Sequence, residues 1–454
     1  MIPVEKNKEY PVKIESLSSD GNGIGHIDGY TIFIPQTVPG DEAVIRVVKV
    51  KSKYGYGKLV HLNSPSPDRQ DALCGNFARC GGCQLMHMSY EAQLRFKQGV
   101  VQDALKRIGG ADGIVVQPVV GMEESTRYRN KLVFPVSQED GKPICGFYAP
   151  RSHQVIPVSE CLLGDCLHRE ILLAVQDYMR ESHVSAYDEQ THTGLVRRIF
   201  LRFAYHTGEI MVALSINGDA LPNENDFTQR IRKVSPRIAS IQLNQNQKRT
   251  NLILGGKNRL LWGKETIADT LCGITYQISL QSFYQVNPVQ TERLYQKAIE
   301  LANLTGKETV FDIYCGIGTI SLACARYAKK VVGVEIVPQA IQDARKNAEE
   351  NSIQNTAFYV GGAEQVVPKL VEDGARPDVV ILDPPRKGSD EKTLSAIASA
   401  QPQRIVYVSC NPATLARDVK CLREYGYEVK ETVPFDMFPN TVHVETVCLL
   451  SKKQ

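Results

Sequence analysis

From residue 309 onward, short apolar runs alternate with helical stretches, and this alternation constrains the fold more than any other feature of the chain. Helical periodicity at 319–327 and 338–351 separates the first apolar runs from one another. The apolar runs predict strands at 309–314, 331–335, 357–360, 378–382, 404–408, 427–430 and 444–450. Strands that alternate with helices in this order form a doubly wound, mostly parallel α/β sheet.

A glycine-containing turn lies between the first strand and the first helix of this sheet. The turn, Asp312-Ile-Tyr-Cys-Gly-Ile-Gly-Thr319, lets the backbone approach a ligand at the carboxyl edge of the sheet. Glu335 ends the next strand, where an acidic side chain binds ribose hydroxyls. Ile320 and Ser321 stand where a dinucleotide site would have its third glycine. The turn therefore favours S-adenosylmethionine over a dinucleotide, and seven strands with a short final connection favour a class I methyltransferase sheet.

With 454 residues, the chain is too long for one ordinary hydrophobic core, so we expect several domains. Residues 1–64 contain β-branched runs separated by Gly, Asp and Pro turns, which predicts a small OB-like β-barrel. A central α+β domain at 68–282 follows, with a helix at about 90–108 that we expect to pack on the catalytic domain. Residues 283–454 form the catalytic domain of alternating strands and helices.

Charge and hydropathy exclude several classes of protein. The formal net charge is only +3, so any nucleic-acid surface must be a local patch. The first residues lack the apolar core of a signal peptide, and no apolar run is long enough to span a bilayer. We expect a cytoplasmic protein without a membrane partner, and the sequence indicates no obligate protein partner.

The expected barrel carries a cationic and aromatic stretch. Lysines interleave with two tyrosines there, which suits phosphate contact and base stacking; the residues are Lys49, Lys51, Lys53, Tyr54, Tyr56 and Lys58. A solvated edge that deters strand pairing is the plainer explanation. Segments 20–25 and 34–41 resemble TRAM domains, small RNA-binding barrels, and this resemblance favours RNA as the partner.

Three reactive side chains lie at or near the ends of predicted strands. Cys410 is placed to attack a substrate held against the cofactor, Asp383 precedes two prolines that end a strand, and Glu445 is a candidate base. Methylation at carbon 5 of a pyrimidine needs such a set, because carbon 5 is a poor nucleophile until a thiolate adds to carbon 6. The plainer explanations are a buried small cysteine, a generic loop and a salt-bridged strand carboxylate.

Five segments, in order, resemble the RNA uracil-5-methyltransferase family: 285–287, 312–318, 383–386, 409–412 and 436–445. The resemblance covers nearly the whole chain. It implies that Cys410 adds to carbon 6 of the uracil, that Glu445 removes the proton from carbon 5 and that Asp383 faces the uracil edge. It implies cofactor contacts at Gln285, Tyr314, Gly316, Gly318, Thr319, Glu335 and Asp383, and a target base near Phe283. Thr319 replaces the Asn of some relatives, which leaves the adenine contacts less defined.

The second chemical signature is a cysteine cluster, Cys74-x5-Cys80-Gly-Gly-Cys83. A fourth ligand must come from elsewhere, and Cys161, Cys166 and Cys145 are the candidates. The resemblance is to family members with a [4Fe-4S] cluster and implies Cys161 as the distant ligand. Zinc is the chemical alternative.

The combination of barrel and cysteines resembles the 23S ribosomal RNA enzymes of the family most closely. We therefore expect 23S ribosomal RNA as the partner, with a transfer-RNA uridine as the alternative. A cytosine-5 enzyme would carry a cysteine in the Asp383-Pro-Pro-Arg386 motif, and an amino-group methyltransferase would leave Cys410 and Glu445 unused. A non-catalytic RNA-binding or ribosome-assembly factor is the alternative from another class.

Overall fold

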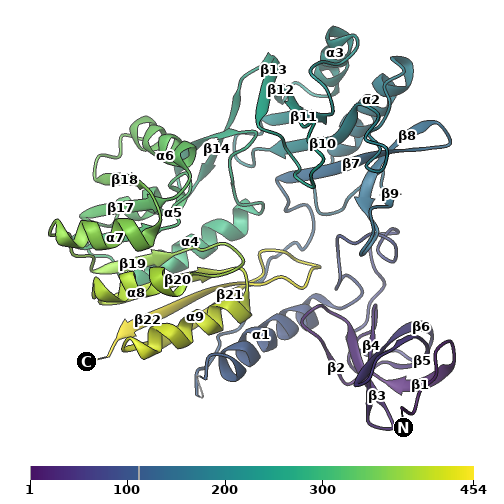
Figure 1. Ribbon diagram of the computed structural model, residues 1–454, viewed down its shortest axis with the longest axis horizontal. Helices are drawn as coiled ribbons and strands as arrows, with labels where there is room; N and C mark the ends of the chain where they lie inside the picture. Colours follow the sequence, from purple (N-terminus) through teal and green to yellow (C-terminus); the bar gives the residue numbers. More distant parts are fainter. Residues whose placement is uncertain (1, 111–112, 454) are drawn as a thin grey trace.

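The computed structural model describes residues 2–110 and 113–453 and contains three bodies (Figure 1). The catalytic sheet with its helices lies at one end, the central sheet lies above it to the right, and the N-terminal barrel lies below the central sheet. A long helix, α1 (Tyr90–Arg107), runs from the barrel along the underside of the catalytic body. None of the helices in these described residues is long and apolar enough to cross a membrane.

The N-terminal barrel is one six-stranded sheet of order β1-β5-β6-β4-β3-β2. Its strands are β1 (Glu9–Lys13), β2 (Ser16–Leu17), β3 (Gly23–Ile27), β4 (Tyr30–Ile34), β5 (Glu42–Val50) and β6 (Tyr54–Ser64). Alternate residues such as Ile32 and Ile45 fill its core. Strand β3 has a weak apolar pattern, because two glycines interrupt it. Both are needed: a Cβ on Gly23 would lie 2.0 Å from Thr37, and one on Gly25 would lie 2.5 Å from Val12.

The central body is a mixed seven-stranded sheet of order β13-β12-β11-β10-β7-β8-β9. Its strands are β7 (Lys131–Glu139), β8 (Lys142–Tyr148), β9 (Val155–Pro157), β10 (Val196–Phe203), β11 (Ile210–Ile216), β12 (Ile238–Gln245) and β13 (Lys257–Gly263). Helices α2 (His168–Glu181) and α3 (Glu224–Val234) pack together and bury Tyr178 and Phe227 against the sheet.

The catalytic body is a seven-stranded sheet of order β18-β17-β16-β19-β20-β22-β21, in which β22 runs opposite to the other six strands. The strands are β16 (Thr309–Ile313), β17 (Lys330–Glu335), β18 (Thr356–Val360), β19 (Val379–Leu382), β20 (Arg404–Ser409), β21 (Tyr427–Phe435) and β22 (Glu445–Lys452). The helices are α4 (Pro288–Ala302), α5 (Thr319–Ala325), α6 (Pro338–Glu350), α7 (Ala363–Glu372), α8 (Glu391–Ser399) and α9 (Pro412–Glu424). Parallel strands end at one edge, so the loops after β16, β17, β19 and β20 share that edge.

Two elements that precede residue 283 pack on the catalytic body. The hairpin of β14 (Thr266–Leu271) and β15 (Ile274–Ser279) contributes Ile267 and Tyr276 to the catalytic core. Helix α1 packs on α9 and β21 and buries Val101 and Leu105 in the core on the other face. Ser89 caps α1 by accepting a hydrogen bond from the backbone N–H of Ala92.

Candidate active site and cysteine cavity

Cys410 directly follows β20 and precedes α9. The side chain of Asn411 caps that helix by accepting hydrogen bonds from two backbone N–H groups, which fixes the turn that presents the thiol. The half-buried Cys410 lines a cavity of about 1000 Å³ together with Arg386 and His443. Barrel residues from Glu15 to Asp20 and residues of α1 form the other wall of this cavity. The nucleophile predicted from the sequence therefore faces a space bounded by two bodies.

The strand register brings Cys410 and Glu445 together. Ser409 of β20 is paired with Thr446 of β22, so the antiparallel register, continued by one residue, sets Cys410 opposite Glu445. On the other side, Leu382 of β19 is paired with Tyr407 of β20, and Asp383 follows Leu382 at the same edge. Three predicted site residues from three adjacent strands thus meet at the carboxyl edge of the sheet.

The electrostatics of this edge favour neutral groups. Burial, with the negative charges of Glu445 and Asp383, raises the pKa of the Cys410 thiol to about 11, while the Arg386 guanidinium opposes the rise. Burial raises the pKa of Asp383 to about 7. Burial, together with Asp383, raises the pKa of Glu445 well above its ordinary value. Near neutral pH, a proton is therefore retained on the thiol and on at least one carboxyl group.

The glycine turn adopts a backbone that leaves space beside it. Tyr314, Gly316 and Gly318 all have positive φ angles, of 70°, 55° and 82°. A Cβ on Gly316 would meet no atom of the described residues within 4 Å, whereas one on Gly318 would lie 3.3 Å from Ala344 and Phe358. Gly318 is therefore needed for packing of the turn, and Gly316 leaves room for a ligand at its surface.

Two carboxyl groups lie beside this turn. Glu335, at the end of β17, accepts hydrogen bonds from the backbone N–H of Gly316 (3.3 Å) and of Val337 (2.9 Å). Asp312 is buried, and burial raises its pKa to about 7. Ser321 donates to Oδ2 of Asp312, but Oδ1 has no hydrogen-bond partner among the described residues. An orphaned buried oxygen, an acidic residue at a strand end and an open glycine fit S-adenosylmethionine, whose ribose and ammonium groups are donors.

The other residues predicted to bind the cofactor or the base differ in their contacts with the rest of the protein. The backbone carbonyl of Gln285 accepts a hydrogen bond from the side-chain amide of Asn130 (2.9 Å), which fixes the segment that carries Gln285. Thr319 is engaged with the protein, because its hydroxyl lies 2.9 Å from that of Tyr295. Phe283 is 68% exposed, an unusual position for a large apolar side chain and one suited to meeting a base.

The predicted cysteines surround a second cavity, of about 320 Å³. Cys74, Cys80, Cys83 and Cys161 line it, with Arg129 and Lys131 among the other lining residues. Cys145 and Cys166, the competing ligands, are not among the described lining residues; Cys145 is buried in the central core and Cys166 is exposed. Burial and the other three cysteines of the cavity raise the pKa of Cys83 to about 12.

Four thiols around one cavity are a donor set that suits iron–sulfur clusters. Within residues 2–110 and 113–453, however, no three His, Cys, Asp or Glu side chains are arranged to hold a metal ion. The thiols line the cavity rather than converging on one point. The expected iron–sulfur cluster is thus supported by the type of side chains around the cavity, and their arrangement in the described residues shows no metal centre.

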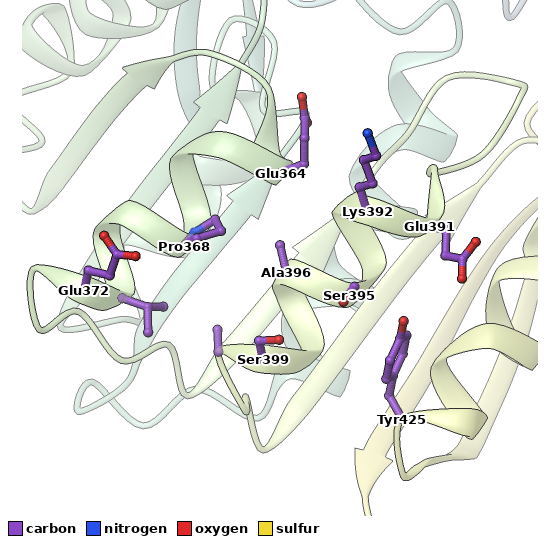
Figure 2. A pocket seen from close by; sticks show the side chains of 11 residues that line it. Glu364, Pro368, Glu372, Glu391, Lys392, Ser395, Ala396, Ser399 and Tyr425 are labelled. Carbon is purple, nitrogen blue, oxygen red and sulfur yellow. The ribbon is translucent and has the colours of Figure 1, made fainter.

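A third hollow, of about 700 Å³, lies between α7 and α8 (Figure 2). The described residues that line it include Glu364, Glu372, Lys392 and Tyr425, and no residue predicted from the sequence to act in the site is among them. Most of its labelled side chains project from α7 and α8, and Tyr425 follows α9 (Figure 2). We assign it no function.

Some residues of the site have no role in the sequence-based prediction. Lys97 and Asp436 form a fully buried ion pair between α1 and the segment after β21. The signal for Lys97 is its position in the buried stripe of α1, which also contains Gln93, Val101 and Leu105. A lysine in an apolar stripe needs a buried partner, but the sequence does not say which.

Comparisons with known proteins were made for the whole chain. The family model described as tRNA (uracil-5-)-methyltransferase matches residues 241–453, and the TRAM domain model matches residues 3–60. An uncharacterized RNA methyltransferase of Halalkalibacterium halodurans is 50% identical over 451 residues, covering 99% of this chain and 98% of the relative. One of Clostridium tetani is 45% identical over 99% of this chain and 98% of its own length. The Pyrococcus abyssi tRNA (uracil-54, C5)-methyltransferase, solved with S-adenosyl-L-homocysteine, is 30% identical with a TM-score of 0.78, covering 97% of this chain and 100% of that chain.

Proposed function

Because the chain belongs to the RNA uracil-5-methyltransferase family and carries a TRAM domain, we propose that it methylates carbon 5 of a uridine in RNA. The observation that carries this proposal is the meeting of Cys410, Asp383 and Glu445 at one edge of the sheet, beside the open glycine turn. S-adenosylmethionine, held against Gln285, Tyr314, Gly316, Gly318 and Glu335, supplies an electrophilic methyl group when bound.

The proposed roles follow from the order of the strands. The Cys410 thiolate adds to carbon 6 of the uracil, which makes carbon 5 nucleophilic enough to take the methyl group. Glu445 then accepts the proton from carbon 5, the electron pair of that C–H bond re-forms the C5–C6 double bond, and Cys410 leaves as a thiolate. Asp383 faces the uracil edge, and Phe283 lies against the base.

The raised pKa values suit this sequence of steps. The raised pKa keeps Cys410 a neutral thiol until a substrate binds, and Arg386 is the charge that favours its thiolate. Glu445, whose conjugate acid is weak because the group is buried, is a stronger base than an exposed carboxylate once it is ionised. Entry of a base displaces water and brings the uracil carbonyl groups as hydrogen-bond acceptors for a protonated Asp383.

RNA binding by the TRAM domain is supported by an aromatic cluster on the outside of the barrel. The rings of Phe33, Tyr54 and Tyr56 lie 5.6–5.8 Å apart, and the Arg151 guanidinium from the central body lies 5.9 Å from the ring centre of Tyr56. Exposed lysines surround the cluster: Lys49, Lys51, Lys53 and Lys58. In the described part of the chain none of these four lysines forms an ion pair, so they are available to phosphates.

For the target we propose 23S ribosomal RNA, on the combination of barrel and four cysteines. A transfer RNA is the second candidate, because the Pyrococcus abyssi relative is named as a tRNA (uracil-54, C5)-methyltransferase and matches nearly the whole chain. For the cysteine cavity we propose a [4Fe-4S] cluster held by Cys74, Cys80, Cys83 and Cys161, with zinc as the alternative. Anaerobic purification followed by iron, sulfide and zinc analysis distinguishes these two ligands.

One experiment tests chemistry and target together. Purified protein is incubated with methyl-labelled S-adenosylmethionine and either undermodified 23S ribosomal RNA or transfer RNA, and the products are digested to nucleosides. We expect label in 5-methyluridine from 23S RNA, and none with Cys410→Ala. Label only from transfer RNA would overturn the proposed target. Label in 5-methylcytidine would contradict the uridine chemistry, and no labelled nucleoside from either RNA, with the cofactor shown to bind, would favour a non-catalytic RNA-binding or ribosome-assembly role.

A further inference from the structure

The segment that joins β21 to β22 carries the proposed base at its end and is held mainly by residues from outside the catalytic sheet. Phe435, the last residue of β21, is paired with Glu445, the first residue of β22. Residues 436–444 therefore leave the sheet and return to it at the same point. The conformation of this segment decides where the Glu445 carboxyl group enters the cavity.

Two buried side chains of helix α1 form hydrogen bonds with this segment. The Lys97 ammonium donates to Asp436 Oδ1 (2.5 Å) and to the backbone carbonyl of Phe438 (3.1 Å). One turn earlier on the same face, the Gln93 side chain accepts from the backbone N–H of Asn440 (2.9 Å). The side chains of Lys97 and Asp436 are both 0% exposed.

The far side of the segment is fixed by other parts of the chain. The Tyr128 hydroxyl donates to the carbonyl of Pro439 (3.0 Å), and Asn287 donates to the carbonyl of Met437 (3.0 Å). Phe438, whose backbone carbonyl accepts from Lys97, also contacts His443. The two rings meet edge-to-face with centres 5.9 Å apart. His443 in turn lines the cavity of Cys410. A continuous chain of contacts therefore runs from Lys97 to the wall of the active site.

A buried ion pair is a poor way to gain stability, because removing two charges from water costs about as much as their attraction returns. Asp436 is not even fully satisfied, since its Oδ2 has no hydrogen-bond partner in the described structure. The pair instead fixes the conformation of the segment. One ammonium group bonded to the Asp436 carboxylate and to the Phe438 carbonyl holds two points of the segment at once.

We infer that Lys97 is a positioning residue for the proton-removal step, acting through Asp436 and Phe438 on the placement of Glu445. This inference rests on the proposed function, because it assigns Lys97 to one step of that reaction. Loss of the ammonium should leave cofactor binding and methyl transfer largely intact and should slow the removal of the carbon 5 proton.

The variants are Lys97→Met, which keeps the length of the side chain, the double variant Lys97→Met/Asp436→Leu, which removes both charges, and Glu445→Gln as the reference for lost proton removal. Lys106→Met is the matched control, since Lys106 is an exposed lysine on the same helix. Each protein is mixed with RNA and S-adenosylmethionine. Turnover, the KM for the cofactor, thermal unfolding and the amount of denaturation-resistant protein–RNA adduct are then measured.

For Lys97→Met we expect turnover to fall between about tenfold and a hundredfold with an unchanged KM for the cofactor, since small displacements of a catalytic group have effects of this size. The Cys410-linked, methylated adduct should accumulate, as in Glu445→Gln. The double variant should recover thermal stability but not turnover. Normal turnover in Lys97→Met, or recovery of turnover together with stability in the double variant, would reduce the pair to a structural role. An inactive wild-type protein would instead overturn the proposed function itself, and this inference with it.

Discussion

Cys410 is proposed to be the nucleophile, yet its surroundings hold it as a neutral thiol. Burial and two neighbouring carboxyl groups raise its pKa to about 11, and one guanidinium opposes them. A thiol of this kind resists oxidation and becomes reactive when a substrate changes the charge balance around it. If Cys410 is the nucleophile, we expect RNA binding to be needed for its reactivity.

Replacing Cys410 with Ala should reduce formation of 5-methyluridine by more than about ten-thousandfold, because carbon 5 then has no route to activation. Nucleoside analysis of the labelled RNA measures this loss. Cys421→Ala is the control, since Cys421 lies on α9 and is absent from the described lining of the cavity. Equal loss in both variants would point to misfolding rather than to a role for the thiol.

Asp312 gives a prediction for stability against pH. Burial raises the pKa of Asp312 to about 7 in the folded protein, whereas the ordinary pKa of this carboxyl group is 3.8. Between these values the folded state binds more protons, so this group lowers the free energy of unfolding as pH rises. Asp312→Asn should therefore flatten the fall in stability between about pH 4 and pH 7, measured by urea unfolding. The surface variant Asp373→Asn should keep the wild-type slope, and an unchanged slope in Asp312→Asn would contradict the assignment.

At the scale of elements, the turn between β16 and α5 and the helix α1 do most to shape the site. The turn was predictable, because a glycine-containing step between a strand and a helix has few conformations. The seven catalytic strands and their doubly wound α/β sheet were also predictable, because the apolar runs are distinct and the first of them alternate with helical periodicity.

The turn yields a test with a closely matched control. Gly316→Ala should weaken binding of S-adenosylhomocysteine by at least about tenfold, because the new methyl group enters the space left for the ligand. Gly374→Ala is the control, because Gly374 also has a positive φ, 92°, and open surroundings. An alanine at either position adds a backbone strain of about 1 kcal/mol, but at 374 it lies outside the site. Calorimetric titration measures both affinities, and equal affinities would place the ligand elsewhere.

The topology of the central sheet could not be read from the sequence. Strand β10 is buried along its whole length yet includes Arg197, Arg198 and Arg202, whose side chains donate to backbone carbonyls of neighbouring loops. The apolar residues between these arginines still indicate a strand at 198–203, but no local pattern says which strands of the central sheet pair with it. The partner of Lys97 lies 339 residues away, and no local pattern encodes that contact.

At the scale of the whole molecule, the barrel, helix α1 and the catalytic body surround one cavity, and the central body contacts the barrel elsewhere. Barrel residues form a wall of the space that Cys410 faces, and Arg151 of the central body reaches the aromatic cluster of the barrel. RNA bound to that cluster would therefore contact two bodies at once.

Replacing Tyr56 with Ala should weaken RNA binding by about tenfold, since one base stacked on an aromatic ring contributes about 1–3 kcal/mol. The affinity for S-adenosylhomocysteine should stay unchanged. Tyr425→Ala, at an exposed tyrosine of the hollow between α7 and α8, is the matched control. Filter binding at several salt concentrations measures both, and an unaltered RNA affinity in Tyr56→Ala would exclude the cluster from the RNA surface.

Strand β22, which begins with Glu445, lies between β20 and β21 although it follows both in the chain. As the polypeptide is synthesised, β20 and β21 emerge first and must wait for the strand that separates them. Until β22 inserts, Glu445, the proposed base, is not opposite the thiol of Cys410, and the segment held by α1 has only one end in the sheet. A nascent chain can thus acquire its RNA-binding barrel long before it acquires a complete catalytic centre, so the order of synthesis itself delays chemistry until folding is finished.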